Sequence, residues 1–323
     1  MGGMLRLWLL FTLALFQLHS AKAEDAYPSR PVYLIVPAAP GGSFDILGRI
    51  IAHGLSERWH SNVIVENRAG GGGNIGALTV SKAEPDGYTL LVWNDSLLIN
   101  PTLLPKTSLD PKNDFTPISL SIYVPNVLVA HPSTGFLTFA DFLSAARAKP
   151  GQMNYGSPGN GSPGHLSFEL LKQLAKIDVV HVPYRGAGPA ISDLLAGHIQ
   201  LGMVAVPGAI GYIRAGTLIP LGVTSARPVA ALPNVPPIAQ AGLPAYKINA
   251  WHGILGPAKM PRDLVKRLER DITDVIKEPA VSQQLIQLGF EPAAGSASEL
   301  AAIIDRDLPI WHDLVIKSGA QTN

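Results

Sequence analysis

The chain has 323 residues, which is long enough for two domains, because single hydrophobic cores stop growing at about 250–300 residues. Apolar residues make up 47% of the chain and charged residues 15%, so the composition excludes intrinsic disorder and favours a compact α/β protein. The formal net charge is only +1 and no basic patch stands out, so we expect no nucleic-acid partner. The absence of cysteine excludes disulfides, a thiol nucleophile and a lipidated cysteine.

Residues 1–23 have the pattern of a signal peptide. Arg6 precedes an almost unbroken apolar segment at residues 7–18, and Ala21-Lys22-Ala23 is a small-x-small cleavage site. The segment is too short to span a bilayer stably, and a buried N-terminal helix is disfavoured because polar Glu24-Asp25 follows at once. We expect cleavage after Ala23 and a periplasmic location. Cleavage removes two of the 25 basic residues, which leaves 23 against 24 acidic ones.

The first strand-turn-helix junction is predicted at residues 33–45. Tyr33 to Val36 is a short apolar, β-branched strand, and a Pro- and Gly-rich turn leads to a helix pattern from Phe44. Such a junction leaves backbone N–H groups at the positive end of a helix, where an anion can bind. We expect Ser43 to cap the helix and the carboxylate of Asp45, in the first turn, to interact favourably with the helix dipole. A structural role for Asp45 is the preferred interpretation, because its carboxylate repels an anion unless loop donors or a cationic ligand group take up the charge.

Strand and helix patterns alternate after this junction. An amphipathic helix is predicted from apolar residues at three- and four-residue spacings, namely Leu47, Ile50, Ile51, Leu55 and Trp59. A strand at residues 63–66, a glycine cluster at 70–73, a short helix from about Ile75 and a strand at 89–93 follow. This succession predicts a parallel sheet with helices on both faces. The pattern loosens over residues 101–117.

A second series begins near Val127. A capping-box spacing from Thr138 to Asp141 precedes a helix to Ala148. Further strands are expected at 153–155, 179–182 and 199–205, further helices at about 165–175 and 189–195, and a Gly- and Ser-rich loop at 156–164.

The chain is then expected to return to its first lobe. Prolines at 228, 233, 236, 237 and 244 indicate an irregular connector, and residues 247–255 read as an extended segment. Helical patterns dominate from Pro261 to Lys317. We therefore expect residues 24–123 and 249–323 in lobe one and 124–248 in lobe two, joined by two crossings with the geometry of a hinge.

Each lobe thus contains one Gly- and Ser-rich loop between a strand and a helix. The loops at 40–45 and 156–165 offer backbone N–H groups and the hydroxyls of Ser43, Ser157 and Ser162. Hydrogen bonds to a charged group contribute about 1.5–3 kcal/mol each, so a few of them can hold a small carboxylate without an arginine.

Motifs along essentially the whole mature chain resemble those of the tripartite tricarboxylate transporter substrate-binding proteins, the Bug family. The residues that carry the resemblance are Tyr27-Pro-Ser-Arg-Pro31, Pro40-Gly-Gly-Ser-Phe-Asp45, Val65-Glu-Asn-Arg-Ala-Gly70, Gly73-Asn-Ile-Gly76, Pro85-Asp-Gly-Tyr-Thr-Leu90, Asn154-Tyr-Gly-Ser157, Gly161-Ser162, Gly164-His165-Leu166 and His181-Val-Pro-Tyr-Arg185.

The resemblance implies an α/β, two-lobed periplasmic binding protein of type II with two parallel-rich sheets. It also implies that the two glycine loops hold a ligand carboxylate, partly through water, and that membrane components of a transporter are the partners. No cofactor or metal is expected, and the protein is expected to be a monomer. The predicted ligand-binding residues are Ala39, Pro40, Gly41, Gly42, Ser43, Phe44, Asp45, Trp93, Asn94, Ser157, Asn160, Gly161, Ser162 and His165.

Three positions differ from the usual family pattern. Trp93-Asn-Asp95 replaces small residues, Arg185 replaces lysine, and Leu201-Gly-Met-Val-Ala205 lacks a frequent Phe-Asp. Trp93, Asn94 and Asp95 are expected in the wall that selects among acids. A tryptophan there favours a ligand with an aromatic ring or a second polar group at its far end, although packing of Trp93 in the core is an equal alternative.

An exported enzyme is the alternative function. Gly71-Gly-Gly73-Asn-Ile-Gly76 satisfies G-x-G-x-x-G, and Asp95 follows 19 residues later, as in a dinucleotide-binding fingerprint. However, residues 66–70 separate the strand from the first glycine, where a tight turn is required. The second loop has no G-x-S-x-G hydrolase elbow, and His165 with Glu169 has no third metal ligand in its pattern.

Overall fold

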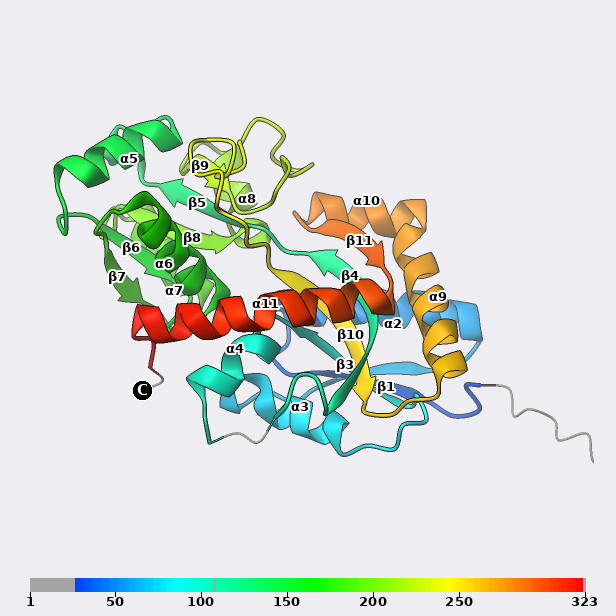
Figure 1. Cartoon of the computed structure of the whole chain (residues 1–323). Helices are drawn as coiled ribbons and strands as arrows, with labels where there is room; N and C mark the ends of the chain where they lie inside the picture. The colour runs from blue at the N-terminus through cyan, green and yellow to red at the C-terminus, as the bar shows by residue number, and fades with distance from the viewer. Residues whose placement is uncertain (1–26, 107–108, 322–323) are drawn as a thin grey trace, which may run out of the picture.

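The computed structural model describes residues 27–106 and 109–321 and contains two β-sheets flanked by helices (Figure 1). The predicted signal peptide and its cleavage site lie outside the described residues. None of the helices in the described parts of the chain combines the length and the apolar character needed to cross a membrane.

The first sheet has six strands in the order β11-β4-β10-β3-β1-β2. Its strands are β1 (Val32–Val36), β2 (Val63–Asn67), β3 (Thr89–Asn94), β4 (Phe115–Tyr123), β10 (Trp251–Pro257) and β11 (Glu291–Gly295). Its helices are α2 (Ser43–Trp59), α3 (Asn74–Ser81), α4 (Ser96–Leu103), α9 (Arg262–Lys277), α10 (Pro279–Gln287) and α11 (Ala297–Ser318), with a 3-10 turn η2 (Gly71–Gly73). The apolar stripe predicted for α2 is confirmed, because Leu47, Ile51 and Leu55 are buried and Ile50 and Trp59 pack partly buried against the same cluster.

The second sheet has five strands in the order β7-β6-β8-β5-β9. Its strands are β5 (Asn126–Ala130), β6 (Asn154–Ser157), β7 (Val180–Pro183), β8 (Leu201–Ala205) and β9 (Ile219–Val223). Its helices are α5 (Phe139–Ala148), α6 (Pro163–Ala175), α7 (Ala187–Leu195) and α8 (Val206–Arg214), with a 3-10 turn η3 (Pro132–Thr134). The capping box predicted for α5 is present, because Thr138 Oγ1 accepts from Asp141 N at 3.2 Å and Asp141 Oδ2 accepts from Thr138 N at 2.9 Å.

Both sheets are mixed, which corrects the expectation of largely parallel sheets. The parallel prediction holds for β1 with β2 and β3, and for β6 with β7 and β8. In contrast, β10 is antiparallel to β3 and β4, and β5 is antiparallel to β8 and β9. Strands β5 and β10 are the ones with which the chain enters each sheet from the other sheet, and each lies between two strands that run in the opposite direction.

Several elements were missed by the sequence analysis. Strand β4 begins at the end of the stretch whose pattern loosens, β11 interrupts the region expected to be helical near the C-terminus, and α4, α8 and β9 were not predicted. Strand β11 has the sequence EPAAG, which lacks the β-branched and aromatic residues that indicate strands. Its pairing with β4 comes from tertiary packing and not from local preference.

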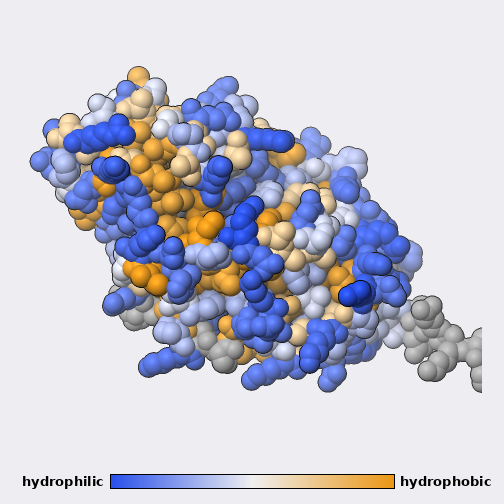
Figure 2. All heavy atoms as spheres, in the orientation of Figure 1, coloured by the Kyte–Doolittle hydropathy of each residue, from blue (hydrophilic) through white to orange (hydrophobic). Residues whose placement is uncertain are grey.

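Helix α11 connects the two halves of the molecule. It packs against β4 and α4 beside the first sheet and against α6 beside the second, and Figure 1 shows it crossing between them. One buried apolar cluster accordingly contains Trp93 near the first sheet, Phe168 near the second, and Trp311 of α11. On the face that α11 crosses, hydrophobic side chains gather between α5 and α6 (Figure 2).

Candidate functional site

The first glycine loop is held by Asp45, whose side chain is 3% exposed. Its Oδ2 accepts hydrogen bonds from Gly41 N and from Arg49 Nε, both at 2.9 Å, and its Oδ1 accepts from Asn67 Nδ2 at 3.0 Å. Burial raises the pKa of Asp45, but these three donors outweigh burial and hold the pKa below its usual value. Donors from the loop, from α2 and from β2 therefore take up the charge of Asp45 together.

Ser43 does not cap α2, which corrects the sequence prediction. Gly42 is the N-cap and provides no side-chain bond, and Ser43 is the first helical residue. The Ser43 hydroxyl instead lies 2.8 Å from His252 Nε2 on β10, and the Phe44 ring stacks on His252 with centroids 4.6 Å apart. The first-turn N–H groups of α2 are thus left without a side-chain acceptor.

The second glycine loop is closed by its own capping residues. Ser162 is the N-cap of α6, and its hydroxyl oxygen accepts from His165 N at 3.2 Å. Gly161 N donates to His165 Nδ1 at 3.0 Å, so in the neutral imidazole the proton is on Nε2. Gly161 has φ +71°, and a Cβ there would lie 2.3 Å from Leu103 Cδ2 of α4, so this loop abuts the first half of the molecule.

A stack of aromatic and imidazole rings supports the second loop from behind. His165 stacks on His181 at 3.9 Å, His181 on Tyr155 at 4.8 Å, and Tyr155 on Phe168 at 3.6 Å between centroids. Ser157 Oγ lies 2.7 Å from His181 Nε2. Burial is the main cause that lowers the pKa of His165 to about 4 and that of His181 to about 3, so both imidazoles are neutral at pH 7.

The remaining predicted residues of the two loops differ in exposure. Ala39, Pro40, Gly41 and Gly42 are exposed, and Asn160 is half-buried with no side-chain hydrogen bond to another described residue. Glu169 is not free to bind a metal with His165, because it accepts from Tyr155 Oη at 2.8 Å and from Lys172 Nζ at 2.9 Å.

The wall residues at the end of β3 are buried. Trp93 is 1% exposed and meets Phe115 edge-on with centroids 6.5 Å apart, which favours the core interpretation over a place in the pocket. Asn94 Oδ1 accepts from Ser96 N at 2.8 Å. Asp95 is fully buried and accepts from Trp251 N at 3.0 Å, and burial raises its pKa to about 7.

The glycines of the G-x-G-x-x-G sequence at residues 71–76 have a structural role. Glycines 70 to 73 all have positive φ, and the turn they form is closed by a bond from Gly73 N to Gly70 O. A Cβ on Gly76 would lie 3.0 Å from Pro37 Cα, so this glycine permits close contact between α3 and the segment that follows β1. The acidic residue of the fingerprint, Asp95, is bonded inside the protein and does not reach a ribose.

His252 and His181 are the functional candidates that sequence reasoning missed. His181 belongs to the motif His181-Val-Pro-Tyr-Arg185, but its spacing to Ser157 gave no sign of contact. His252 lies in a segment predicted only as extended, and no sequence signal links it to Ser43, which is 209 residues away.

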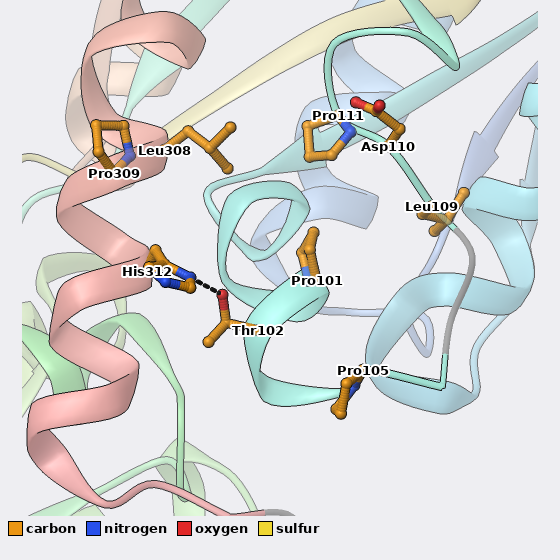
Figure 3. A pocket seen from close by; sticks show the side chains of 9 residues that line it. All are labelled: Pro101, Thr102, Pro105, Leu109, Asp110, Pro111, Leu308, Pro309 and His312. Atoms are coloured by element: carbon orange, nitrogen blue, oxygen red, sulfur yellow. Dashed lines mark hydrogen bonds between the residues drawn. The ribbon is translucent and has the colours of Figure 1, made fainter.

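A groove of about 690 Å³ lies between α4 and α11 (Figure 3). Apolar and proline side chains line most of it, and Thr102 Oγ1 contacts His312 Nδ1 at 2.8 Å on its wall. None of the predicted ligand-binding residues belongs to this groove.

Solved structures of similar proteins share this architecture. The chain is 32% identical to "R. palustris Rpa4515 with adipate", with a TM-score of 0.81 and coverage of 91% of this chain and 99% of the other. It is 29% identical to "MatC (Rpa3494) from Rhodopseudomonas palustris with bound malate", with a TM-score of 0.76 and coverage of 90% and 100%. The fold therefore defines a two-lobed α/β solute-binding protein, as the sequence predicted.

The family follows from the sequence comparisons. The model of the tripartite tricarboxylate transporter family receptor matches residues 47–319. A protein encoded in the tcbD-tcbE intergenic region of Pseudomonas sp. strain P51 is 38% identical over 304 residues, which cover 94% of this chain and 90% of the relative. The chain belongs to the tripartite tricarboxylate transporter receptor family. Its members are receptors, so the prediction that the protein is not an enzyme is confirmed and the alternative of an exported enzyme is set aside.

Proposed function

We propose that this protein is a periplasmic receptor that captures a small organic carboxylate between its two glycine loops and delivers it to the membrane components of a tripartite transporter. The observation that carries the proposal is the pair of strand-glycine-helix junctions, one in each half, each immobilised by its own polar side chains. One related structure is solved with adipate and another with bound malate, which supports the ligand class.

In the first loop, backbone N–H groups at the start of α2 bind the carboxylate. They have no side-chain cap, and the negative charge of Asp45 is already neutralised by three donors. Oriented N–H groups at a helix N-terminus favour an anion through both hydrogen bonding and the helix dipole.

In the second loop, the Ser162 hydroxyl and His165 Nε2–H serve as donors. Ser162 accepts only the cap bond through its oxygen, so its hydroxyl proton is available to a ligand. No described residue accepts a bond from His165 Nε2, and the ring is held rigidly by the stack on His181.

The two lobes close on the ligand about the segments at residues 123–126 and 248–251. Sheet membership supports this division, because β4 and β10 lie in the first sheet while β5 and β9 lie in the second. Export by cleavage after Ala23, a monomeric state and the boundaries at 24–123, 124–248 and 249–323 belong to the same proposal.

The proposal is tested by calorimetry on the mature protein after unfolding and dialysis have removed any copurified acid. Native mass spectrometry of the protein as purified first identifies the acid to titrate. Gly41→Val should abolish most of the affinity, because a side chain at φ +89° strains the loop and blocks approach of the carboxylate.

Gly135→Val is the matched control for Gly41→Val. Gly135 also has positive φ, at +71°, and like Gly41 it faces open space, but it ends η3 far along the chain from both loops. Equal affinity of the two variants would place the site elsewhere, and turnover of the acid in place of stoichiometric binding would refute the receptor function.

A further inference from the structure

The hydrogen-bond polarity of Ser43 is set by His252. His252 Nδ1 lies 2.8 Å from the carbonyl oxygen of Trp251. A carbonyl oxygen only accepts, so Nδ1 carries the proton and donates it. The neutral ring then has no proton on Nε2, which is an acceptor, and the Ser43 hydroxyl at 2.8 Å is the group that donates to it.

The surroundings keep His252 in this state. The side chain is 3% exposed, and burial lowers its pKa to about 4 against the opposing effect of the Trp251 carbonyl. Phe44 stacks on the ring at an interplanar angle of 12°, which fixes its orientation. At pH 7 the ring is therefore a fixed acceptor for the Ser43 proton.

Ser43 consequently offers lone pairs to a ligand and not a proton. Its Oγ makes no further hydrogen bond with the described residues, and the side chain is half-buried at the start of α2. This differs from Ser162 in the second loop, whose oxygen accepts the cap bond and whose proton is free.

We propose that the Ser43–His252 pair recognises a hydroxyl group on the ligand beside its carboxylate, so that the receptor selects hydroxy acids over unsubstituted acids. This inference rests on the carboxylate site proposed above. His252 is the positioning residue, and Ser43 is the contact that accepts the ligand hydroxyl.

A neutral hydroxyl fits this position better than an ammonium group. Asp45 is the only acidic residue in residues 37–45 and 156–165, and both of its oxygens are already bonded. An ammonium group would lose hydration without gaining an unpaired carboxylate from either loop, whereas a hydroxyl needs only one acceptor.

The test measures affinity ratios by calorimetry with the matched pairs malate and succinate, and 2-hydroxyadipate and adipate. Malate and 2-hydroxyadipate carry the hydroxyl, and succinate and adipate lack it. For the wild-type protein we expect the hydroxy acid that fits the cleft to bind about three- to tenfold more tightly than its unsubstituted partner. Aspartate and 2-aminoadipate report on an ammonium group at the same carbon.

His252→Phe should lower the ratio below that of the wild type, because phenylalanine keeps the stacking but frees the Ser43 proton, so that Ser43 can then bond to a carboxylate as well as to a ligand hydroxyl. Ser43→Ala should remove the preference, and the double variant should match Ser43→Ala alone. His312→Phe is the control, because His312 forms a similar imidazole–hydroxyl contact with Thr102 outside the loops, and its ratio should equal that of the wild type.

The outcomes separate this inference from the proposed function. Binding of succinate or adipate as tightly as the hydroxy acid, or tighter binding of the amino acids, overturns the inference and leaves the receptor function standing. A preference that survives in Ser43→Ala also overturns it, and this variant decides the matter even where His252→Phe fails to fold. Failure of all these acids to bind overturns the inference, and the proposed function fails with it only if the copurified acid identified by native mass spectrometry does not bind either.

Discussion

Replacement of Asp45 by asparagine tests how the first glycine loop is held. The three donors to Asp45 are Gly41 N, Arg49 Nε and Asn67 Nδ2. An asparagine keeps one oxygen, so in either orientation of the amide an NH2 group faces at least one of these donors. The loop loses one of these hydrogen bonds when the amide oxygen takes the Oδ2 position and two when it takes the Oδ1 position, and each remaining bond is then made to a neutral acceptor.

The magnitude follows from these contacts. A hydrogen bond to a charged group contributes about 1.5–3 kcal/mol, so the free energy of unfolding should fall by about 2–4 kcal/mol when one such bond is lost and the others weaken. Release of the backbone at Gly41 adds an ordering cost to binding of about 1–2 kcal/mol per residue, which lowers ligand affinity by about tenfold.

Guanidinium unfolding followed by tryptophan fluorescence measures the stability, and calorimetry measures the affinity. Asp141→Asn is the control, because Asp141 also accepts two backbone N–H bonds at a helix start, at 2.9 and 3.0 Å, but belongs to α5. The control should lose stability and keep its affinity. Wild-type stability of Asp45→Asn would refute the three-donor interpretation, and lost affinity at full stability would make Asp45 a direct ligand contact.

Three further predictions follow from the same structure. Trp93→Ala should lower the free energy of unfolding by about 3–5 kcal/mol by leaving a core cavity, with unchanged affinity in calorimetry; lost affinity at full stability would place Trp93 in the pocket. Ser162→Ala should lose about 1 kcal/mol of stability as an N-cap and weaken binding by about 1–2 kcal/mol, whereas Thr138→Ala, another N-cap, should affect stability alone. Burial raises the pKa of Asp95 to about 7, so between about pH 4 and 7 its carboxyl is protonated in the folded protein and ionised in the unfolded chain, and the wild type loses stability as the pH rises. Asp95→Asn lacks this loss and should become more stable relative to the wild type over the same range in urea titrations. An equal difference in stability at all pH values would contradict this.

The sequence alone determined the local elements whose signals lie within a few residues. Alternating apolar runs and glycine turns placed β1, α2, β6 and α6, and the spacing of Thr138 to Asp141 gave the capping box of α5. These features depend on backbone preferences and on neighbours in the chain, so a single sequence carries the information for them.

The tertiary structure decided what distant residues do together. Ser43 was predicted to cap α2 because its type and position fit a cap, yet its hydroxyl bonds to His252 on β10. The sequence left two interpretations of Trp93 open, and its burial against Phe115 and Gly73 favours the core. A side chain such as Ser43 can make several hydrogen bonds of similar strength. Which one forms depends on the groups that folding brings within 3 Å, and here the fold brings an imidazole from 209 residues away because β10 returns to pair between β3 and β4.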